Sequence, residues 1–464
     1  MACGDCGTGF VAGEKPGFPI PAPAPVGQNH NERHDDGHAI FPLSVARGVT
    51  QRPPDEGRGP QRRTFLHAGL CAAATCLAGR TVRAAEPPHD VTFVEDFDEL
   101  WSTLAQRYCF FSDKQTDWNR VRALYRPMAV RATSTDAFAD IVRRVLAELY
   151  DAHTHLSQPS DGMPRWPLYD LMANRQADRI RIEAVAEDSA ASAAGLRAGD
   201  VIAAIDGRPA GQVMRDLMPR CLRGPDRNAD TYVANVAVAG RVGQGRTLLL
   251  ERQGEAPRPV SLPVRKTAAK PDVEWRRLAG NIGYIAIRGF GDEKVVRDFD
   301  DALMALRDTG GLVIDVRYDG GGDTAIARPI MGRFIDTPKP YAMMRRRDGS
   351  HLGPSWTETV EPAGPFTYSR PVVVLTNHWS ASMAEGFPMG MRDIGRAIVV
   401  GTPMMGLGAA VFPICLDRTG IQAQYSAEPV YDTAGRPRWK MQPDICVPEG
   451  GDILNAGLRA LHAS

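Results

Sequence analysis

The spacing of hydrophobic residues changes twice after residue 90, and each pattern is typical of a different kind of domain. Between 93 and 149 apolar residues recur at helical spacing, which predicts helices with one buried face. From 179 to 251 they form short runs bounded by small residues and glycine turns, which favours a β-rich segment. From 282 onward apolar strands alternate with helical segments, which predicts a mainly parallel sheet.

These patterns predict a multidomain α/β protein. We expect a small helical N-terminal domain at 90–165, a β-rich domain at 168–265 and an α/β core at 272–464. A chain of 464 residues is too long for one ordinary core, which agrees with this division. After residue 90 no apolar run is long enough to cross a bilayer, so an integral membrane protein is not expected.

The first 85 residues differ from the rest. Residues 1–60 are rich in Gly, Pro, Asn, Asp and Arg, and we expect a disordered leader there. Within 61–85 the pair Arg62-Arg63 precedes an Ala-rich apolar run and small residues at Ala84 and Ala85. That order is typical of a twin-arginine-type signal segment, which predicts a periplasmic or otherwise exported protein rather than a cytoplasmic one. The alternative is a chance arginine pair before an Ala-rich helix.

Charge and motif content exclude several classes of partner. Lys and Arg together number 55, as do Asp and Glu, and a nucleic-acid binder would need a net basic surface. We find neither a phosphate-binding loop nor a set of residues with metal-ligand spacing, so no cofactor and no metal are expected.

The strongest sign of chemistry is a serine at a strand-to-helix junction. The apolar strand 371–375 leads into a polar turn that delivers Ser382 among small residues at the start of a helix. In α/β enzymes such a turn exposes a nucleophilic hydroxyl, while the following backbone N–H groups point at the same space. Ser382 is therefore the candidate nucleophile, and the alternative is a small residue that closes the turn.

A glycine triplet predicts the oxyanion site. Gly320–Gly322 follows the buried strand 312–316, and glycine lets backbone N–H groups approach a ligand closely. We expect the donors to be the N–H of Gly321 or Gly322 and that of Met383. Tight packing of strand against helix is the other explanation for the triplet.

Histidine at a helix end supplies the candidate base. His153 lies in a polar segment where imidazole, which titrates near neutrality, could take the serine proton. His155 and His378 are the alternatives, and Asp151 is a possible orienting partner.

Together these segments resemble the C-terminal processing (tail-specific) serine peptidases. The matching residues are 151–154, 315–322, 380–385, 395–401 and 443–444, in that order. The block 189–207, with its Gly-Leu-x-x-Gly-Asp pattern, resembles a PDZ domain, although a generic β-rich insert remains the alternative. The resemblance implies a ClpP/crotonase-like core, an acyl-enzyme on Ser382, and a PDZ domain that binds a substrate peptide as an added strand.

The sequence departs from this pattern at Leu407. The Ser/Lys branch of the family carries a lysine there, and leucine cannot accept a proton. The resemblance is therefore closer to the tricorn-protease-core branch, with a Ser/His site and His153 as the base. That branch also has a serine before the histidine, where this chain has Ala152, and a glutamate near the C-terminus that is not evident here.

An exported serine peptidase acting on peptide or protein substrates is the function that these residues favour. One alternative is a catalytically weak or inactive peptide-binding protein on the same scaffold, and another is an ester or amide hydrolase.

Overall fold

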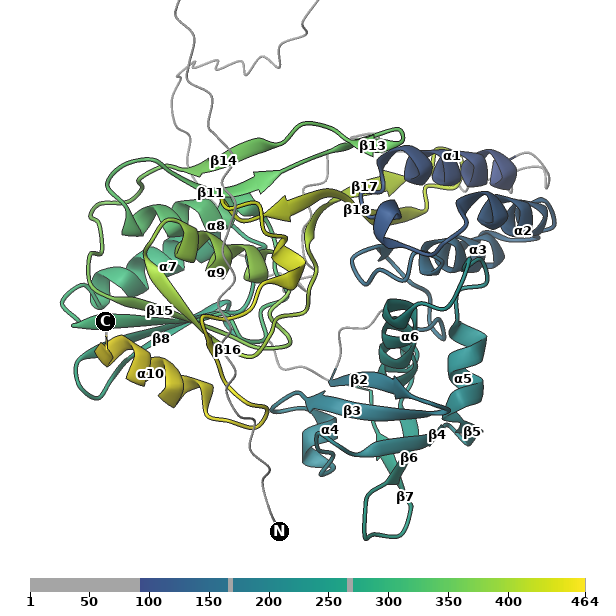
Figure 1. Cartoon of the computed structure of the whole chain (residues 1–464), viewed down its shortest axis with the longest axis horizontal. Coiled ribbons are helices and arrows are strands. Elements are labelled where there is room, and N and C mark those ends of the chain that lie inside the picture. The colour runs from purple at the N-terminus through teal and green to yellow at the C-terminus, as the bar shows by residue number, and fades with distance from the viewer. Residues whose placement is uncertain (1–91, 166–169, 265–269, 464) are drawn as a thin grey trace, which may run out of the picture. The chain divides into compact units, whose positions relative to one another are not determined.

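The structure is a computed structural model that describes residues 92–165, 170–264 and 270–463 (Figure 1). The expected leader at 1–60 and the expected signal segment at 61–85 lie outside these ranges. No helix within them combines the length and the apolar character that crossing a bilayer requires.

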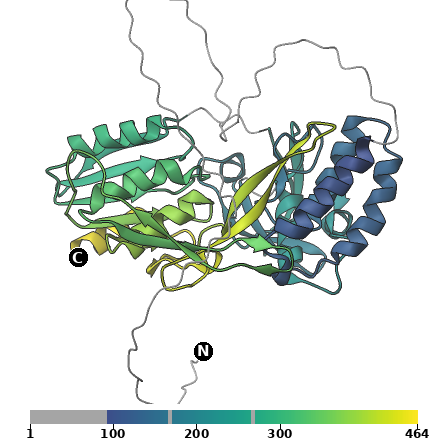
Figure 2. The same ribbon diagram turned by 90° about the horizontal axis from the view of Figure 1, so that it is seen from above.

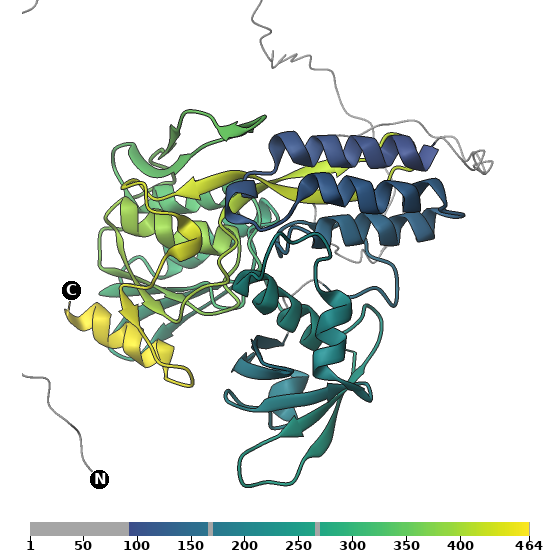
Figure 3. The ribbon, with the colours of Figure 1, turned by 45° about the vertical axis from the view of Figure 1, so that its right-hand side comes forward.

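The N-terminal part consists of helices that lie side by side (Figure 3). They are α1 (Thr92–Arg107), α2 (Trp118–Val130) and α3 (Thr135–Ala147). The predicted start of α3 is confirmed, because Ser134 is its N-cap and accepts a hydrogen bond from the Ala137 N–H.

These helices share their hydrophobic core with a β-ribbon from the C-terminal half of the chain. The short strand β1 (His155–Leu156) pairs antiparallel with β18 (Gln422–Tyr431). Buried residues of β17 (Ala409–Cys415) and β18, such as Ile414 and Tyr425, belong to the same cluster as Phe97 and Leu100. The helical segment therefore packs against strands that the sequence analysis did not predict.

The middle part is an antiparallel sheet with the strand order β2-β3-β4-β6-β7. Its strands are β2 (Leu171–Gln176), β3 (Arg179–Val185), β4 (Val201–Ile205), β6 (Arg246–Glu251) and β7 (Arg258–Leu262), with β5 (Arg208–Pro209) paired to β4. The associated helices are α4 (Ala190–Ala193), α5 (Ala210–Leu217) and α6 (Arg227–Ala239). The strands predicted at 179–185 and 201–205 are confirmed.

The core sheet has the order β19-β16-β15-β10-β9-β8, in which only the pair β8–β9 is antiparallel. The strands are β8 (Val273–Leu278), β9 (Ile282–Ile287), β10 (Gly311–Asp315), β15 (Val372–Thr376), β16 (Ala397–Gly401) and β19 (Ile445–Cys446). The predicted mainly parallel sheet is thus confirmed.

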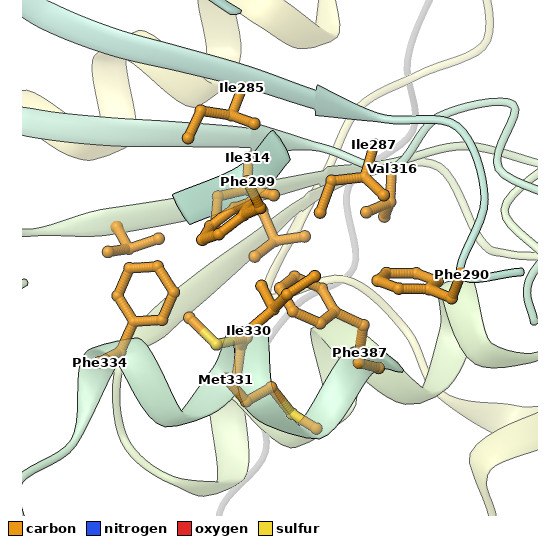
Figure 4. Close-up of a cluster of buried hydrophobic side chains, with 14 of the residues drawn as sticks. Ile285, Ile287, Phe290, Phe299, Ile314, Val316, Ile330, Met331, Phe334 and Phe387 are labelled. Atoms are coloured by element: carbon orange, nitrogen blue, oxygen red, sulfur yellow. The ribbon is translucent and has the colours of Figure 1, made fainter. Parts of the chain in front are cut away.

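Helices cover both faces of this sheet. On one face lie α7 (Lys294–Ala305), α8 (Thr324–Met331) and α9 (Met383–Asp393), and on the other lies α10 (Ile453–Ala463) (Figure 1). Phe299, Ile314 and Phe387 interlock between the sheet and the first group of helices (Figure 4). Burial on both faces explains why the central strands are continuous apolar runs in the sequence.

A further sheet, with the order β1-β18-β11-β14, extends from the core. Its other members are β11 (Lys339–Met344), β14 (Trp356–Val360) and β17, and a hairpin of β12 (Arg347–Asp348) and β13 (His351–Leu352) lies between β11 and β14 in the chain. Strands β17 and β18 form the long yellow ribbon of Figure 2. Short 3-10 turns occur at Phe111–Asp113, Gly332–Phe334 and Arg438–Lys440, the last of which is η3.

Candidate active site

Ser382 lies at the junction of β15 and α9 in a backbone conformation that non-glycine residues rarely adopt. Its φ and ψ are 56° and −113°, and it is the N-cap of α9. Such a conformation costs about 1–3 kcal/mol and persists only where the surroundings impose it. The side chain is half-buried between the buried residues Ala381 and Met383. The predicted strand–turn–helix around this serine is confirmed.

The turn before Ser382 is bonded to the loop that follows β10. The Ser380 hydroxyl donates to the Val316 carbonyl at 2.8 Å and accepts from the Asn377 N–H at 3.0 Å. The Ala381 N–H donates to the Asp319 carbonyl at 3.0 Å. These contacts hold the serine turn and the glycine loop together as one unit.

Two glycines of that loop are required by close packing. Gly321 has a φ of +98°, and a Cβ there would lie 2.7 Å from Ser382 Cβ and 2.9 Å from the Met383 nitrogen. Gly322 has a φ of +142°, and its Cβ would overlap the backbone of Phe290. Because Gly321 lacks a side chain, the space beside Ser382 and the Met383 N–H stays open.

The predicted oxyanion donors differ in their hydrogen bonding. The Gly321 N–H donates to Asp319 Oδ1 at 2.7 Å and is therefore engaged within the loop. The Met383 N–H belongs to the first turn of α9, where N–H groups have no acceptor within the helix. Asp319 itself is fully buried, and burial raises its pKa well above the usual value.

Glu385 connects the serine turn to the turn that carries Leu407. Its Oε1 accepts from the Ser382 N–H at 3.0 Å and from the Leu407 N–H at 2.7 Å. The carboxyl group is fully buried, and burial raises its pKa to about 7, although the nearby charge of Arg438 acts in the opposite direction. The sequence analysis did not assign Glu385 to the site. An acidic residue three positions after a serine N-cap was the available signal.

His153 lies in a segment whose backbone is fixed to β18. Asp151 accepts from the His153 N–H at 2.9 Å, from Thr154 Oγ1 at 2.8 Å and from Ser426 Oγ at 2.7 Å. Gln424 Nε2 donates to the His153 carbonyl at 3.1 Å. Asp151 thus holds the backbone of the histidine rather than its ring, which differs from the orienting role considered for it.

The imidazole of His153 is buried, and its Nδ1 has no hydrogen-bond partner among the described residues. Burial lowers the pKa of His153 to about 4, and the charges of Arg438 and His155 act in the same direction, against that of Asp151. The ring is therefore neutral at pH 7, which is the form that a general base needs. Within the described ranges no hydrogen bond joins this ring to Ser382.

The two alternative bases have other partners. His155 Nδ1 lies 2.8 Å from the carbonyl oxygen of Leu156, and His378 Nε2 lies 3.2 Å from Glu449 Oε2. Leu407, where the resemblance led us to expect a lysine in the Ser/Lys branch, is buried and apolar. The described residues contain no group of three or more His, Cys, Asp and Glu side chains arranged to hold a metal ion.

Two family models match this chain. Residues 281–447 match peptidase family S41, and residues 90–147 match the Tricorn protease C1 domain. The chain is 25% identical over 281 residues to carboxyl-terminal-processing peptidase 1, chloroplastic, of Arabidopsis thaliana, covering 58% of this chain and 54% of that protein. It is 25% identical over 251 residues to the carboxy-terminal-processing protease of Bartonella bacilliformis, covering 52% of each. The chain thus spans about half the length of these curated relatives.

The fold is that of a solved processing protease. The photosystem II D1 C-terminal processing protease superposes with a TM-score of 0.51 at 19% identity, covering 77% of this chain and 93% of the other. The carboxyl-terminal-processing peptidases of family S41 are serine proteases. The segment that matches peptidase family S41 includes Ser382 and the glycine loop, and the segment that matches the Tricorn C1 domain includes α1, α2 and α3.

Proposed function

We propose that this protein is a serine peptidase that cleaves peptide bonds through an acyl-enzyme on Ser382, with His153 as the general base. The observation that carries the proposal is the Ser382 turn itself. A strained serine begins a helix, and Gly321 packs against its Cβ and the next N–H group. Such a turn presents a hydroxyl and backbone donors to one reacting carbonyl.

The chemistry follows the serine-hydrolase sequence. Ser382 Oγ attacks the peptide carbonyl carbon while His153 takes the hydroxyl proton, and the C–N bond then breaks as His153 returns that proton to the leaving amine. Water then attacks the resulting ester while His153 takes a proton from it, and His153 returns that proton to Ser382 Oγ as the ester bond breaks. Because hydrogen bonds between nucleophile and base are often long without substrate, we expect the Ser382–His153 contact to form when substrate binds.

The oxyanion donors in this proposal are the N–H groups of Gly322 and Met383. The Gly321 N–H is bonded to Asp319, so its contribution in this conformation is the open space that it leaves beside Ser382. A base other than lysine is needed because Leu407 is apolar, and the neutral imidazole of His153 meets that need.

We further propose that the sheet β2–β7 is a PDZ domain that binds substrate peptide. Its edge strand β2 faces α6, where Asn235 bonds both the N–H and the carbonyl of Ala173, at 2.9 Å and 2.8 Å. An added peptide strand would take the place of this amide. The same sheet contacts the serine turn through Tyr318. The Glu187 N–H, just after β3, donates to the Tyr318 hydroxyl at 3.0 Å, and the Tyr318 ring stacks on Trp379.

The decisive experiment is labelling with a fluorophosphonate probe, with the modified residue mapped by mass spectrometry. We expect Ser382 to be labelled, and the Ser382→Ala variant to lose both the label and peptide hydrolysis. Ser350→Ala, which removes an exposed serine in the β12–β13 hairpin, is the matched control and should label normally. A folded wild-type protein without label at Ser382 would refute the peptidase proposal.

The unpartnered Nδ1 of His153 favours one second candidate, a peptide-binding protein of weak or no activity on the same scaffold. Binding of peptides by a protein whose Ser382 does not label would identify it. A protein that labels at Ser382 and hydrolyses p-nitrophenyl esters but no peptides would instead be an ester hydrolase.

We also propose that the protein is exported, because of the twin-arginine-type segment at 61–85. A reporter fused after residue 90 should reach the periplasm, and replacement of Arg62 and Arg63 by lysine should retain it in the cytoplasm.

A further inference from the structure

We infer that Arg438 is a positioning residue for this site, whose buried guanidinium binds the Gly406–Gly408 turn, which is joined to Ser382 through the Glu385 carboxylate. The residue begins η3, 56 positions after the serine in the numbering of the chain. Its role in catalysis rests on the proposed function, whereas its structural contacts do not.

The guanidinium of Arg438 lies against the backbone of the Leu407 turn. Its Nη2 donates to the Leu407 carbonyl at 2.6 Å and to the Ala409 carbonyl at 3.3 Å. Its Nη1 would lie 3.1 Å from a Cβ added at Gly386, so it also contacts the first turns of α9. Only 6% of the residue is exposed. The side chain therefore bridges the Leu407 turn and the nucleophile helix.

An acidic and a basic side chain bind the backbone of Leu407, one at its N–H and the other at its carbonyl. The Leu407 N–H donates to Glu385 Oε1, and the Leu407 carbonyl accepts from Arg438. A buried cation needs a nearby anion to offset its desolvation, and Glu385 is the carboxylate that interacts with this guanidinium. Since the same Glu385 oxygen accepts from the Ser382 N–H, the position of Arg438 is linked to that of the nucleophile.

The charge of Arg438 also lowers the pKa of His153, the proposed base. The charged and titratable groups that influence the His153 ring are Asp151 on its own segment, His155 on β1, and Arg438 on η3. Asp151 in turn interacts with Lys114 and Tyr108 of the helical segment. Of these groups Arg438 is a permanent cation beside the nucleophile turn, and it disfavours the imidazolium form of His153.

Arg438 therefore supplies a positive charge at a turn whose side chain, Leu407, supplies none. It cannot act as the proton acceptor, because a guanidinium does not deprotonate in proteins. Its contribution is to hold the serine turn and to add to the effect of burial, which lowers the pKa of His153.

The first test measures the titration of His153 by NMR with labelled histidine, in the Ser382→Ala background, so that it does not require activity. Arg438→Met should raise the pKa of His153, whereas Arg438→Lys, which keeps the charge, should leave it close to the wild-type value. The control is Arg436→Met, an exposed arginine two residues earlier that pairs with Asp432. An unchanged His153 titration in Arg438→Met would overturn the inference.

The second test measures the rate of fluorophosphonate labelling of Ser382 across the pH range. Arg438→Met should label about tenfold to a hundredfold more slowly, because small misplacements of reacting groups have effects of that size. Arg438→Lys should recover part of the rate and the wild-type pH profile. Equal losses with unchanged profiles in both variants would show a merely structural role and would also overturn the inference.

Folding and catalysis can be separated in these experiments. The double variant Glu385→Gln/Arg438→Met removes both buried charges, which is often tolerated better than removing one. It should fold and still show the raised His153 pKa. If His153 shifts as expected but the wild-type protein never labels at Ser382, the positioning role stands and the peptidase proposal fails.

Discussion

The proposed nucleophile and the proposed base of this site are held in place in different ways. In the Ser382 turn, the Ser380 hydroxyl donates to the loop after β10. The Ser382 N–H donates to Glu385, which also accepts from the Leu407 N–H. His153 has a backbone fixed by Asp151 and Gln424, yet its ring Nδ1 is buried without a partner among the described residues. The hydrogen bonds of the Ser382 turn come from the α/β core, whereas the position of His153 depends on the contact between the helical segment and β18.

Because of this difference, we expect substitutions around Ser382 and around His153 to have different kinds of effect. The serine turn is held by many short contacts, so substitutions there act through geometry. Burial and nearby charges set the pKa of the His153 ring, so substitutions there should act through protonation. The following variants separate these two kinds of effect.

The largest effect is expected on the base. His153→Gln keeps a side chain of similar size but cannot accept and return a proton, so labelling of Ser382 and peptide hydrolysis should fall by about a hundredfold to ten-thousandfold. The measurement is the second-order labelling rate at pH 7.5. His351→Gln, at an exposed position in β13, should react as the wild type does. A wild-type rate in His153→Gln would assign the base elsewhere, and His155→Gln and His378→Gln would then identify it.

The next largest effect is expected from a substitution that changes the geometry of the serine turn. Gly321→Ala places a methyl group 2.7 Å from Ser382 Cβ at a φ of +98°, so the turn must shift or the open space beside it is lost. We expect activity to fall about a hundredfold, the size of effect seen when an oxyanion donor is removed.

The adjacent glycine provides the matched control for that variant. Gly320 is exposed, and a Cβ there would meet nothing within 4 Å, so Gly320→Ala should stay within a fewfold of the wild type. Equal activities for the two alanine variants would contradict the role given to Gly321.

These variants also mark what could be predicted from the sequence. Ser382 and Gly320–Gly322 were found because each lies directly after an apolar strand, and parallel strands bring such loops to one edge of the sheet. Glu385 and Arg438 were missed as members of the site. Their roles depend on contacts with Leu407, which is distant from both in sequence, and no local pattern signals such a contact.

In the fold, too, contacts between residues far apart in the sequence could not be predicted, and the helical segment is an example. Its helices were predicted from spacing. The β17–β18 ribbon that completes their core lies far along the chain, between Ala409 and Tyr431, and its hydrophobic pattern is too irregular to be recognised. The unpartnered ring nitrogen of His153 could not be predicted either, because it depends on how β18 packs against the Asp151 segment.

A moderate effect is expected from the buried acid that links the two turns. Glu385 has a pKa of about 7, so as the pH falls through that value its carboxylate becomes neutral and its hydrogen bonds to the Ser382 and Leu407 N–H groups weaken. Glu385→Gln should therefore label about tenfold more slowly than the wild type at pH 8.5 and at a similar rate at pH 5.5.

The full pH profiles make that comparison sharper. The wild-type rate should decline as pH falls through about 7, on account of Glu385, and again as pH falls through about 4, where His153 becomes protonated. The Glu385→Gln profile should keep only the limb near 4. If the limb near 7 persists in the variant, that limb belongs to another group.

The smallest effect should be on stability, at Asp319. Burial raises its pKa in the folded protein, so folding favours the protonated form, and the stability associated with it is present at low pH and is lost as pH rises above the ordinary carboxyl range. Asp319→Asn keeps an oxygen acceptor for the Gly321 N–H and has no such titration. The melting temperature of the variant relative to the wild type should therefore rise between pH 5 and pH 8, by the equivalent of about 1–2 kcal/mol. The exposed Asp301→Asn should show no such trend, and a constant difference for Asp319→Asn would mean that this carboxyl group is ionised in the folded protein and that the glycine loop beside Ser382 carries a negative charge.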